Sequence, residues 1–379
     1  MKNRVESILF FLSCCCISLL AQAETGVNGK TIVLGQSVAL SGPAQQLGTE
    51  MRDGALAYFD HINAQGGVNG RQIVLKTLDD GYEADRAAAN TKQLIEKEGA
   101  FALFGYVGTP TSNAAMPLVN KEEIPFFAPF TGAQSLREPF NRNVFHIRAS
   151  YFEETEKIVD HSTTLSLKRI AVFYQNDAYG KAGLEGVTRA LKKRNIEVVG
   201  LATVERNSVD VTAAVAKLKL AKPQAVIMIS AYTSCAAFIK EMIKDTSAAP
   251  VFWNISFVGS QALSKELGKD GRGVMISQVM PAPWEDITAV VKEYKNLYAN
   301  KPGREVGYVS LEGFIAAKVM VEGLKRAGGG LTRDGLIRAL ESMNSYNAGG
   351  FQVKFSSSNH SASTYVDLSV IGKDGKFMH

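Results

Sequence analysis

The stretch LFGYVGTPTSNAAMP, residues 103–117, begins as a buried strand and changes character within a few residues. Leu103 and Phe104 suit a buried strand. The residues at 109–112, Thr-Pro-Thr-Ser, are typical of the start of a helix. A strand that runs so directly into a helix exposes several unpaired backbone N–H groups at the junction. The stretch therefore predicts a strand-to-helix unit of the kind from which α/β folds are built.

Strand-like and helix-like segments alternate on both sides of this junction. A first series of strands is expected at residues 31–40, 71–78, 101–105 and 124–130. A second series starts near Tyr151, with strands expected at 169–175, 196–204, 224–231 and 250–255. Helical patterns separate these strands, and repeated strand and helix units imply parallel sheets covered on both faces. The two series predict an α/β protein with two lobes.

The last third of the chain breaks this alternation. Residues 284–343 are predicted to be mostly helical, and two more strands are expected at 349–355 and 364–372. Because these strands need a sheet that has already formed, the chain is expected to pass between the lobes more than once.

Composition supports a globular protein of two domains. The chain has 379 residues, of which 46% are hydrophobic, so it can bury a substantial core. Its net charge of +5 is scattered along the chain without a basic run, so no nucleic-acid partner is expected. Three of its four cysteines lie at residues 14–16, which leaves Cys235 without a disulfide partner.

Residues 1–23 have the pattern of a secretory signal peptide. Lys2 and Arg4 precede an apolar stretch at 8–20, and Ala21-Gln22-Ala23 forms a small-residue cleavage site. The apolar stretch is shorter than the roughly 20 residues that a membrane-spanning helix needs. We expect a periplasmic protein, with a lipid anchor through the cysteines at 14–16 left as an alternative.

Motifs of catalysis and nucleotide binding are missing from the sequence. Gly29-Lys30-Thr31 lacks the first glycine of a phosphate-binding loop, and the glycines at 66–70 have the wrong spacing for a dinucleotide fold. The chain has no Gly-x-Ser-x-Gly and no His-Glu-x-x-His motif. No catalytic residue, no metal site and no cofactor is therefore expected.

Several motifs resemble one family, the periplasmic branched-chain amino-acid binding proteins, which are type I substrate-binding proteins of ABC importers. They include Leu40-Ser41-Gly42-Pro43, the turn INAQGGVNGR at 62–71, the 103–117 stretch and Tyr179-Gly180. The resemblance runs from about Lys30 to Phe377.

This resemblance implies a type I periplasmic binding protein, with two doubly wound parallel-sheet lobes joined by three crossover segments. The crossovers are expected near residues 148, 277 and 346. The lobes would then comprise 24–148 with 278–345, and 149–277 with 346–379.

The resemblance also implies a ligand site between the lobes. The loop at Val107, Gly108 and Thr109 would bind the ligand's carboxylate at a helix N-terminus, although Thr109 as a simple helix cap remains an alternative. Phe130 would present its backbone, and either Thr131 or Gly132 would supply a second donor. The remaining candidates are Leu47 as a wall, Tyr151 just past the first crossover, Tyr179 and Tyr232 closing from the second lobe, and Ser256.

Ser256 departs from the family pattern. Amino-acid binders of this group have a glutamate there, which pairs with the ligand's ammonium. A buried ammonium without a partner costs several kcal/mol. Either another acid, Glu153, Asp177 or Glu312, reaches the site, or the ligand has no free ammonium.

The expected function is capture of a small ligand that bears a carboxylate, either an amino acid or a related organic acid, and its delivery to the membrane permease of an ABC importer. The protein is expected to act as a monomer and to do no chemistry. A ligand sensor that feeds a signalling partner is the alternative.

Overall fold

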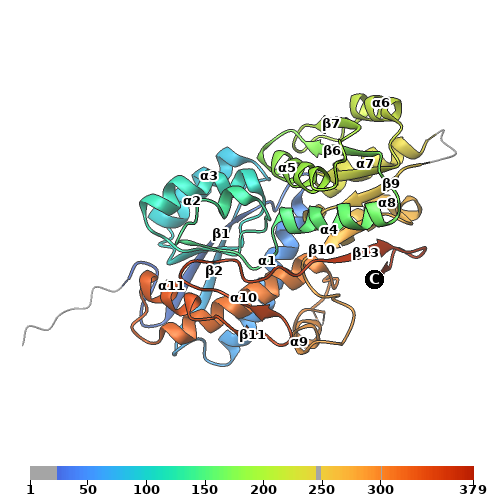
Figure 1. Ribbon diagram of the computed structural model, residues 1–379. Coiled ribbons are helices and arrows are strands. Elements are labelled where there is room, and N and C mark those ends of the chain that lie inside the picture. Colours follow the sequence, from blue (N-terminus) through green and yellow to red (C-terminus); the bar gives the residue numbers. More distant parts are fainter. Residues whose placement is uncertain (1–23, 245–248, 300) are drawn as a thin grey trace, which may run out of the picture.

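The computed structural model describes residues 24–244, 249–299 and 301–379, which fold into two lobes, each built around its own sheet (Figure 1). The expected signal peptide at 1–23 lies outside the described residues. Within the described part of the chain, no helix has both the length and the apolar character to cross a membrane.

The first lobe is built on a five-stranded sheet in the order β2-β1-β3-β4-β5, with every neighbouring pair parallel. Its strands are β1 (Thr31–Val38), β2 (Gln72–Asp79), β3 (Ala102–Phe104), β4 (Phe126–Phe127) and β5 (Val144–Phe145). Three helices alternate with them, α1 (Gln45–Ala64), α2 (Ala84–Glu96) and α3 (Thr109–Lys121). The expected strand at 103–104 and helix from Thr109 are confirmed.

The second lobe is built on a seven-stranded sheet in the order β14-β13-β10-β9-β8-β6-β7. The strands are β6 (Ile170–Gln175), β7 (Gly200–Val204), β8 (Ala225–Ile229), β9 (Val251–Asn254), β10 (Met275–Gln278), β13 (Asp367–Ile371) and β14 (Phe377–Met378). The expected strand at 196–204 begins only at Gly200. Because β13 runs antiparallel to both β10 and β14, this sheet is mixed rather than wholly parallel as expected.

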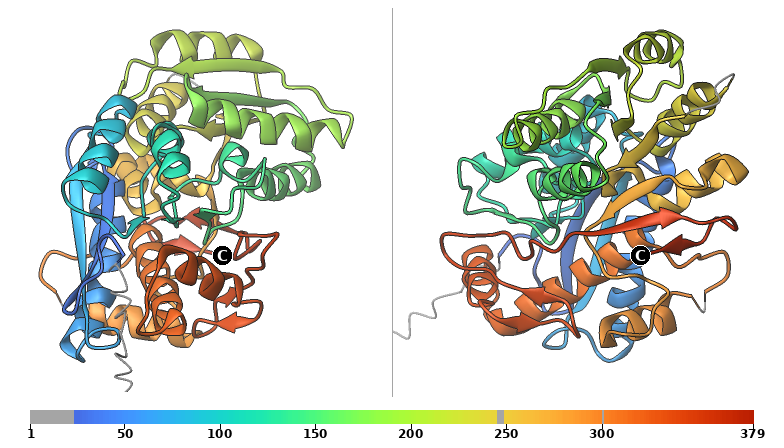
Figure 2. Two further views of the ribbon diagram at one scale, coloured as in Figure 1. Left: turned by 90° about the vertical axis from the view of Figure 1, so that its left-hand side faces the viewer. Right: turned by 45° about the vertical axis from the view of Figure 1, so that its right-hand side comes forward.

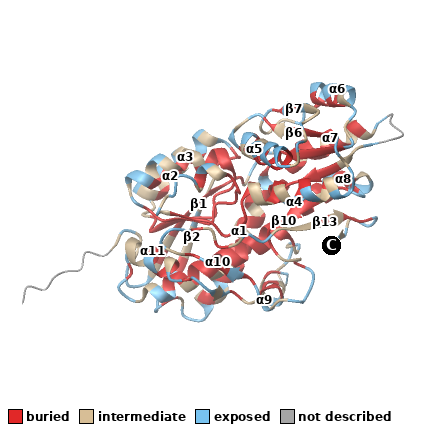
Figure 3. Ribbon diagram, in the orientation of Figure 1, coloured by how far each residue is buried: buried red, intermediate tan, exposed pale blue. Residues whose placement is uncertain are grey.

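Helices cover the second sheet and complete the first lobe. The second sheet carries α4 (Tyr151–Thr164), α5 (Ala178–Lys192), α6 (Thr212–Ala221), α7 (Tyr232–Ile243) and α8 (Ser260–Leu267). Of the last three helices, α9 (Ala289–Tyr298) and α10 (Tyr308–Ala327) pack on α1 of the first lobe, and α11 (Arg333–Glu341) packs on α10 (Figure 2). Figure 3 shows the buried residues gathered along the central strands and the facing sides of these helices.

The chain crosses between the lobes three times. The first passage is 146–150, between β5 and α4, and the second is 279–288, between β10 and α9. The third lies within 354–366, after the small sheet on the first lobe, and it runs beside the first passage, where His146 exchanges backbone hydrogen bonds with His360 and Ala362. The crossover expected near 346 is therefore placed too early.

The strand expected at 349–355 joins neither main sheet. Only Gln352–Val353 (β12) is extended, and it pairs with Tyr346–Asn347 (β11) in a separate two-stranded sheet. A backbone hydrogen bond from the Val290 N–H to the Gly349 oxygen holds this small sheet against the first lobe. The strand expected at 364–372 is confirmed as β13.

Two glycines allow α1 and α10 to cross in close contact. A Cβ atom on Gly54 would lie 1.9 Å from the backbone oxygen of Ser310, and one on Gly313 would lie 2.2 Å from the backbone oxygen of Met51. These distances are well inside van der Waals contact, so any side chain at either position forces the helices apart.

We expect Gly313→Ala to lower the free energy of unfolding by about 1–3 kcal/mol, the usual cost of overpacking a close contact. Gly330→Ala is the matched control, because nothing lies within 4 Å of a Cβ atom at that position. Urea denaturation of both variants and the parent checks the prediction. Equal midpoints for all three proteins would contradict it.

Candidate functional site

A cluster of three hydroxyl groups lies where β3 runs into α3. The Oγ1 atoms of Thr109 and Thr131 are 2.7 Å apart, and Thr131 Oγ1 lies 3.2 Å from the hydroxyl of Tyr151. All three side chains are buried. The side chain of Thr109 does not cap its own helix, since Gly108 occupies the N-cap position and makes no side-chain cap. The cap interpretation of Thr109 is therefore wrong, and its hydroxyl belongs to the cleft.

The loop before α3 is fixed by pairing with the segment after β4. Val107 and Phe130 form a parallel bridge, and the Gly108 N–H donates to the Phe130 oxygen at 3.2 Å. The Phe130 N–H donates to Tyr106 at 2.7 Å, so both backbone groups of Phe130 are engaged and its ring is the part that faces the cleft. Pro110 has no N–H and the Ser112 N–H donates to the Gly108 oxygen at 3.1 Å, so the N–H groups of Thr109 and Thr111 are the ones that the helix itself does not pair.

The choice between Thr131 and Gly132 is resolved by the side chains. Thr131 belongs to the hydroxyl cluster, whereas Gly132 packs directly under Tyr151. A Cβ atom at position 132 would lie 2.6 Å from the Tyr151 ring, and the Gly132 oxygen accepts the Tyr151 N–H at 2.7 Å. Gly132 thus positions Tyr151 at the start of α4.

The second lobe closes over this cluster with the expected tyrosines. The Tyr179 ring lies 5.6 Å from that of Tyr151, measured between centroids. The Tyr232 hydroxyl accepts the backbone N–H of Gln46 from the first lobe at 3.4 Å. Leu47 packs against Gly259 of the second lobe, where a Cβ atom would lie 2.4 Å from the Leu47 side chain.

Two aromatic residues complete the cleft without having been predicted. Phe257, next to Ser256, lies with its ring centroid 4.4 Å from Tyr179, 5.4 Å from Phe130 and 6.0 Å from Tyr82. The Tyr82 hydroxyl accepts from Gln175 of the second lobe at 3.3 Å. Both follow a strand by only a few residues, since β2 ends at Asp79 and β9 at Asn254, and this position is the signal in the sequence that could have found them.

These contacts close the two lobes upon each other. The cavity that remains between them, lined by residues that include Phe130, Arg148, Ser256 and Glu312, measures about 10 Å³. That volume suits about one water molecule. A larger ligand therefore enters only when the lobes separate.

The acid that contacts Ser256 is Glu154, which was not among the acids expected there. Glu154, on α4, accepts the Ser256 N–H at 2.7 Å, the Ser256 hydroxyl at 3.0 Å and the Ser277 hydroxyl at 2.5 Å. Burial raises the pKa of the Glu154 carboxyl above its ordinary value. Glu154 follows the N-cap residue Ser150 by one helical turn, so the sequence places it near the start of α4. No sequence pattern indicates that Ser256 after β9 and Ser277 of β10 lie next to it.

Of the three acids suggested from the sequence, Glu312 lines the cavity between the lobes, where it is paired with Arg148, and the other two are engaged elsewhere. Glu153 forms a capping box with Ser150, and Asp177 caps α5 while lying 3.1 Å from Arg206. Glu312 is buried and forms two hydrogen bonds of 2.9 Å with Arg148.

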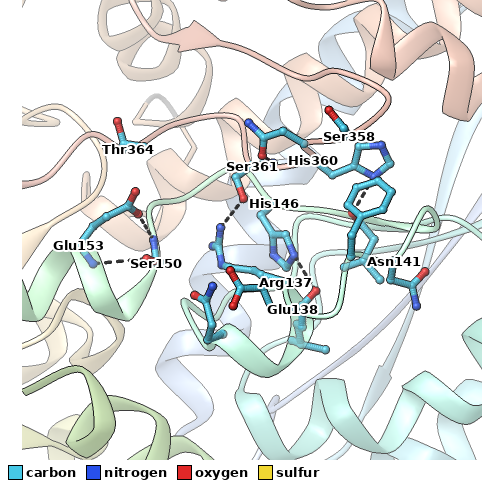
Figure 4. A pocket seen from close by; sticks show the side chains of 15 residues that line it. Arg137, Glu138, Asn141, His146, Ser150, Glu153, Ser358, His360, Ser361 and Thr364 are labelled. Carbon is cyan, nitrogen blue, oxygen red and sulfur yellow. Dashed lines mark hydrogen bonds between the residues drawn. The ribbon is translucent and has the colours of Figure 1, made fainter. Parts of the chain in front are cut away.

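A separate pocket of about 440 Å³ lies beside the first and third passages (Figure 4). Arg137 reaches across it to the Ser361 hydroxyl at 2.8 Å and to the backbone oxygen of Arg148 at 3.0 Å. Glu153, one of the acids considered for the ligand site, lines this pocket, whereas Thr109, Thr131 and Tyr179 do not. Arg137 thus ties two passages together outside the cleft.

The two lobes, the three passages and the buried cleft between the lobes define a two-lobed binding protein. A profile of the periplasmic binding protein family matches residues 31–376. The chain belongs to this family, which confirms the resemblance found in the sequence.

Relatives and solved structures agree with this assignment. Leu/Ile/Val-binding protein homolog 3 of Brucella melitensis is 23% identical over 308 residues, covering 78% of this chain and 79% of the relative. A possible leucine/isoleucine/valine-binding protein from Rhodopirellula baltica is 34% identical, with a TM-score of 0.88 over 94% of this chain and 98% of that one. A substrate-binding periplasmic protein from Ralstonia solanacearum is 31% identical, with a TM-score of 0.86 over 91% of this chain and 99% of that one.

Glu50 is a titratable group at the rim of the cleft, on the face of α1 that meets the second lobe. It accepts a hydrogen bond of 2.8 Å from Gln46, whose backbone contacts Tyr232. Burial raises the pKa of the Glu50 carboxyl from 4.5 to about 7, and the negative charges of Glu305 and Asp53 act in the same direction.

We expect the parent to lose stability relative to Glu50→Gln as the pH rises from about 4.5 through 7. The folded carboxyl holds its proton more tightly than the unfolded one, so its contribution is complete at low pH and is lost as the folded group ionises. The free energy of unfolding falls by about 1.4 kcal/mol for each unit by which folding raises the pKa of Glu50. Urea denaturation at pH 4, 6 and 8 measures it, and parallel pH profiles for the two proteins would contradict it.

Proposed function

We propose that this protein is the periplasmic substrate-binding component of an ABC importer and that it captures a small carboxylate between its closing lobes. The observation that carries the proposal is the buried hydroxyl cluster of Thr109, Thr131 and Tyr151 at the N-terminus of α3. These hydroxyls and the N–H groups of Thr109 and Thr111 are donors, and the helix N-terminus favours a negative charge.

The strength of such a site is adequate for capture and release. A hydrogen bond to a charged group contributes about 1.5–3 kcal/mol, so a few of them with some apolar burial reach micromolar affinity, near −8 kcal/mol. Ligand favours the closed state only through contacts with both lobes. Thr109 and Thr131 from one lobe and Tyr179 from the other are placed to make them.

The other end of the ligand is better matched to a neutral or apolar group than to an ammonium. The rings of Tyr82, Phe130, Tyr179 and Phe257 line the cleft. Glu154 already accepts three hydrogen bonds, and its raised pKa disfavours the charged form that an ammonium requires.

The delivery role needs no covalent step and no partner chain in the site. Cys235 is fully buried, so its thiol cannot reach another molecule while the protein is folded. This supports a monomer that meets the permease through its outer surface.

We expect a thermal-shift screen of purified protein to show stabilisation by small organic acids and little response to amino acids with the same carbon skeleton. The physical reason is that no free carboxylate in the cleft offsets the cost of burying an ammonium. Leucine or valine that raises the melting temperature while the deaminated acids do not would restore an ordinary amino-acid binder. A response to neither class would overturn the proposal.

We expect Thr109→Val and Thr131→Val each to weaken binding of the acid found in that screen by about 1–3 kcal/mol, the cost of leaving a charged acceptor short of a donor. Titration calorimetry measures the loss. Thr91→Val is the matched control, because Thr91 is also buried and hydrogen-bonded but lies on α2, under Tyr106. Equal affinities in all three variants would contradict the assignment.

A further inference from the structure

Arg148, in the first passage, uses only part of its hydrogen-bonding capacity. Its Nε and Nη2 atoms each donate to Glu312 at 2.9 Å. A guanidinium carries five N–H donors in a planar fork. The pair with Glu312 engages one edge of this fork, which leaves the edge formed by Nη1 and the second Nη2 hydrogen.

This remaining edge is buried without an acceptor for Nη1. The Arg148 side chain is 1% exposed, and Nη1 has no hydrogen-bond partner among the residues that the structure describes. A buried donor left unpaired costs about 1–3 kcal/mol, and more when it is charged. Such groups are rare in folded proteins, so an acceptor that is not part of the chain is expected at this edge.

The cavity beside Arg148 belongs to the ligand cleft. Its lining includes Phe130 and Ser256, which face each other across the lobes, together with Gln278 and Glu312. The Arg148 guanidinium carbon lies 4.2 Å from the centroid of the Phe130 ring. Arg148 also precedes Tyr151 by three residues, which limits the separation of their Cα atoms to about 10 Å. One small molecule can therefore span the hydroxyl cluster and this edge.

The charges around the cavity select the kind of acceptor. Glu312 already compensates the charge of Arg148, and Glu154 lies close enough to raise the pKa of Arg148 further. A second carboxylate on the ligand would face both acids. An ammonium would bring donors to an edge that already consists of donors. A neutral oxygen meets neither difficulty.

We propose that the free edge of Arg148 binds a neutral oxygen at the far end of the ligand, so that the substrate is an oxygenated carboxylate such as a keto or phenolic acid. This inference rests on the proposed function and names the substrate class within it. Arg148 then determines specificity, while the hydroxyl cluster supplies the common carboxylate site.

The test compares matched acids on the parent protein by titration calorimetry. The pairs are pentanoate with 4-oxopentanoate, and 3-phenylpropanoate with 3-(4-hydroxyphenyl)propanoate. We expect the oxygenated member of at least one pair to bind at least tenfold more tightly. Affinities within threefold in both pairs would overturn the inference while leaving the carboxylate proposal intact. Failure of all four acids to bind would overturn both.

Arg148→Lys provides the second arm, because lysine keeps the charge opposite Glu312 but lacks the free edge of the fork. We expect it to remove the preference for the oxygenated acid and to change the affinity of the plain acid by less than threefold. Arg137→Lys, at the half-buried arginine that lies outside the cleft, is the control and should keep the preference. If Arg148→Lys weakens both acids equally, Arg148 is a structural ion pair and the inference is wrong.

A crystal structure of the parent with 4-oxopentanoate or 3-(4-hydroxyphenyl)propanoate settles the contact even if Arg148→Lys does not fold. We expect the distal oxygen within hydrogen-bond distance of Nη1. A water molecule bound to Nη1, with the ligand oxygen elsewhere, would overturn the inference.

Discussion

The buried ion pair between Arg148 and Glu312 anchors the boundary between the two lobes. It fastens the first passage to α10, and α10 in turn crosses α1 at two glycines that admit no side chain. Removing one partner of a buried pair typically costs 3–5 kcal/mol, because the other charge is left without compensation. The same stretch of backbone also receives Arg137, which holds the third passage through Ser361. Two of the three passages are thus fastened to side chains of the first lobe.

The hydroxyl cluster lies at the first lobe and the first passage, whereas Tyr179 and Phe257 belong to the second lobe. The hydroxyl cluster joins Thr109 and Thr131 of the first lobe to Tyr151, the first residue of α4, at the point where the chain enters the second lobe. Any rotation of the second lobe therefore changes the distance of Tyr179 and Phe257 from the hydroxyl cluster. A ligand shifts this equilibrium only by the contacts it gains on closure.

The sequence was sufficient for the parts of the fold and the site that depend on local pattern. Alternating strands and helices predicted both lobes, and the junction expected at 103–117 is the junction of β3 and α3. The ligand-binding roles of Thr109, Thr131, Tyr179 and Tyr232, which the family resemblance implied, stay predictions. Local pattern failed where segments distant in the chain converge. Glu154 becomes a cleft residue only because β9 and β10 present Ser256 and Ser277 to it.

The late crossover shows a second limit of sequence patterns. An apolar run such as 351–355 predicts an extended segment but does not specify its partner strand. Here the run pairs within a small sheet on the first lobe, so the return to the second lobe is delayed to β13. Arg148 and Glu312 lie 164 positions apart, and their pairing has no local signature either.

The place of β13 in the second sheet has a consequence for biogenesis. β10 ends at Gln278, but the strand that covers its outer edge begins only at Asp367. While the intervening segment is being synthesised or exported, the second lobe presents an unpaired strand edge, which is a template for aggregation. The first lobe can form most of its sheet early, since β1 to β5 are contiguous in the chain. Chaperone holding before β13 is made should therefore matter most for the second lobe, and truncations before β13 should be rapidly degraded.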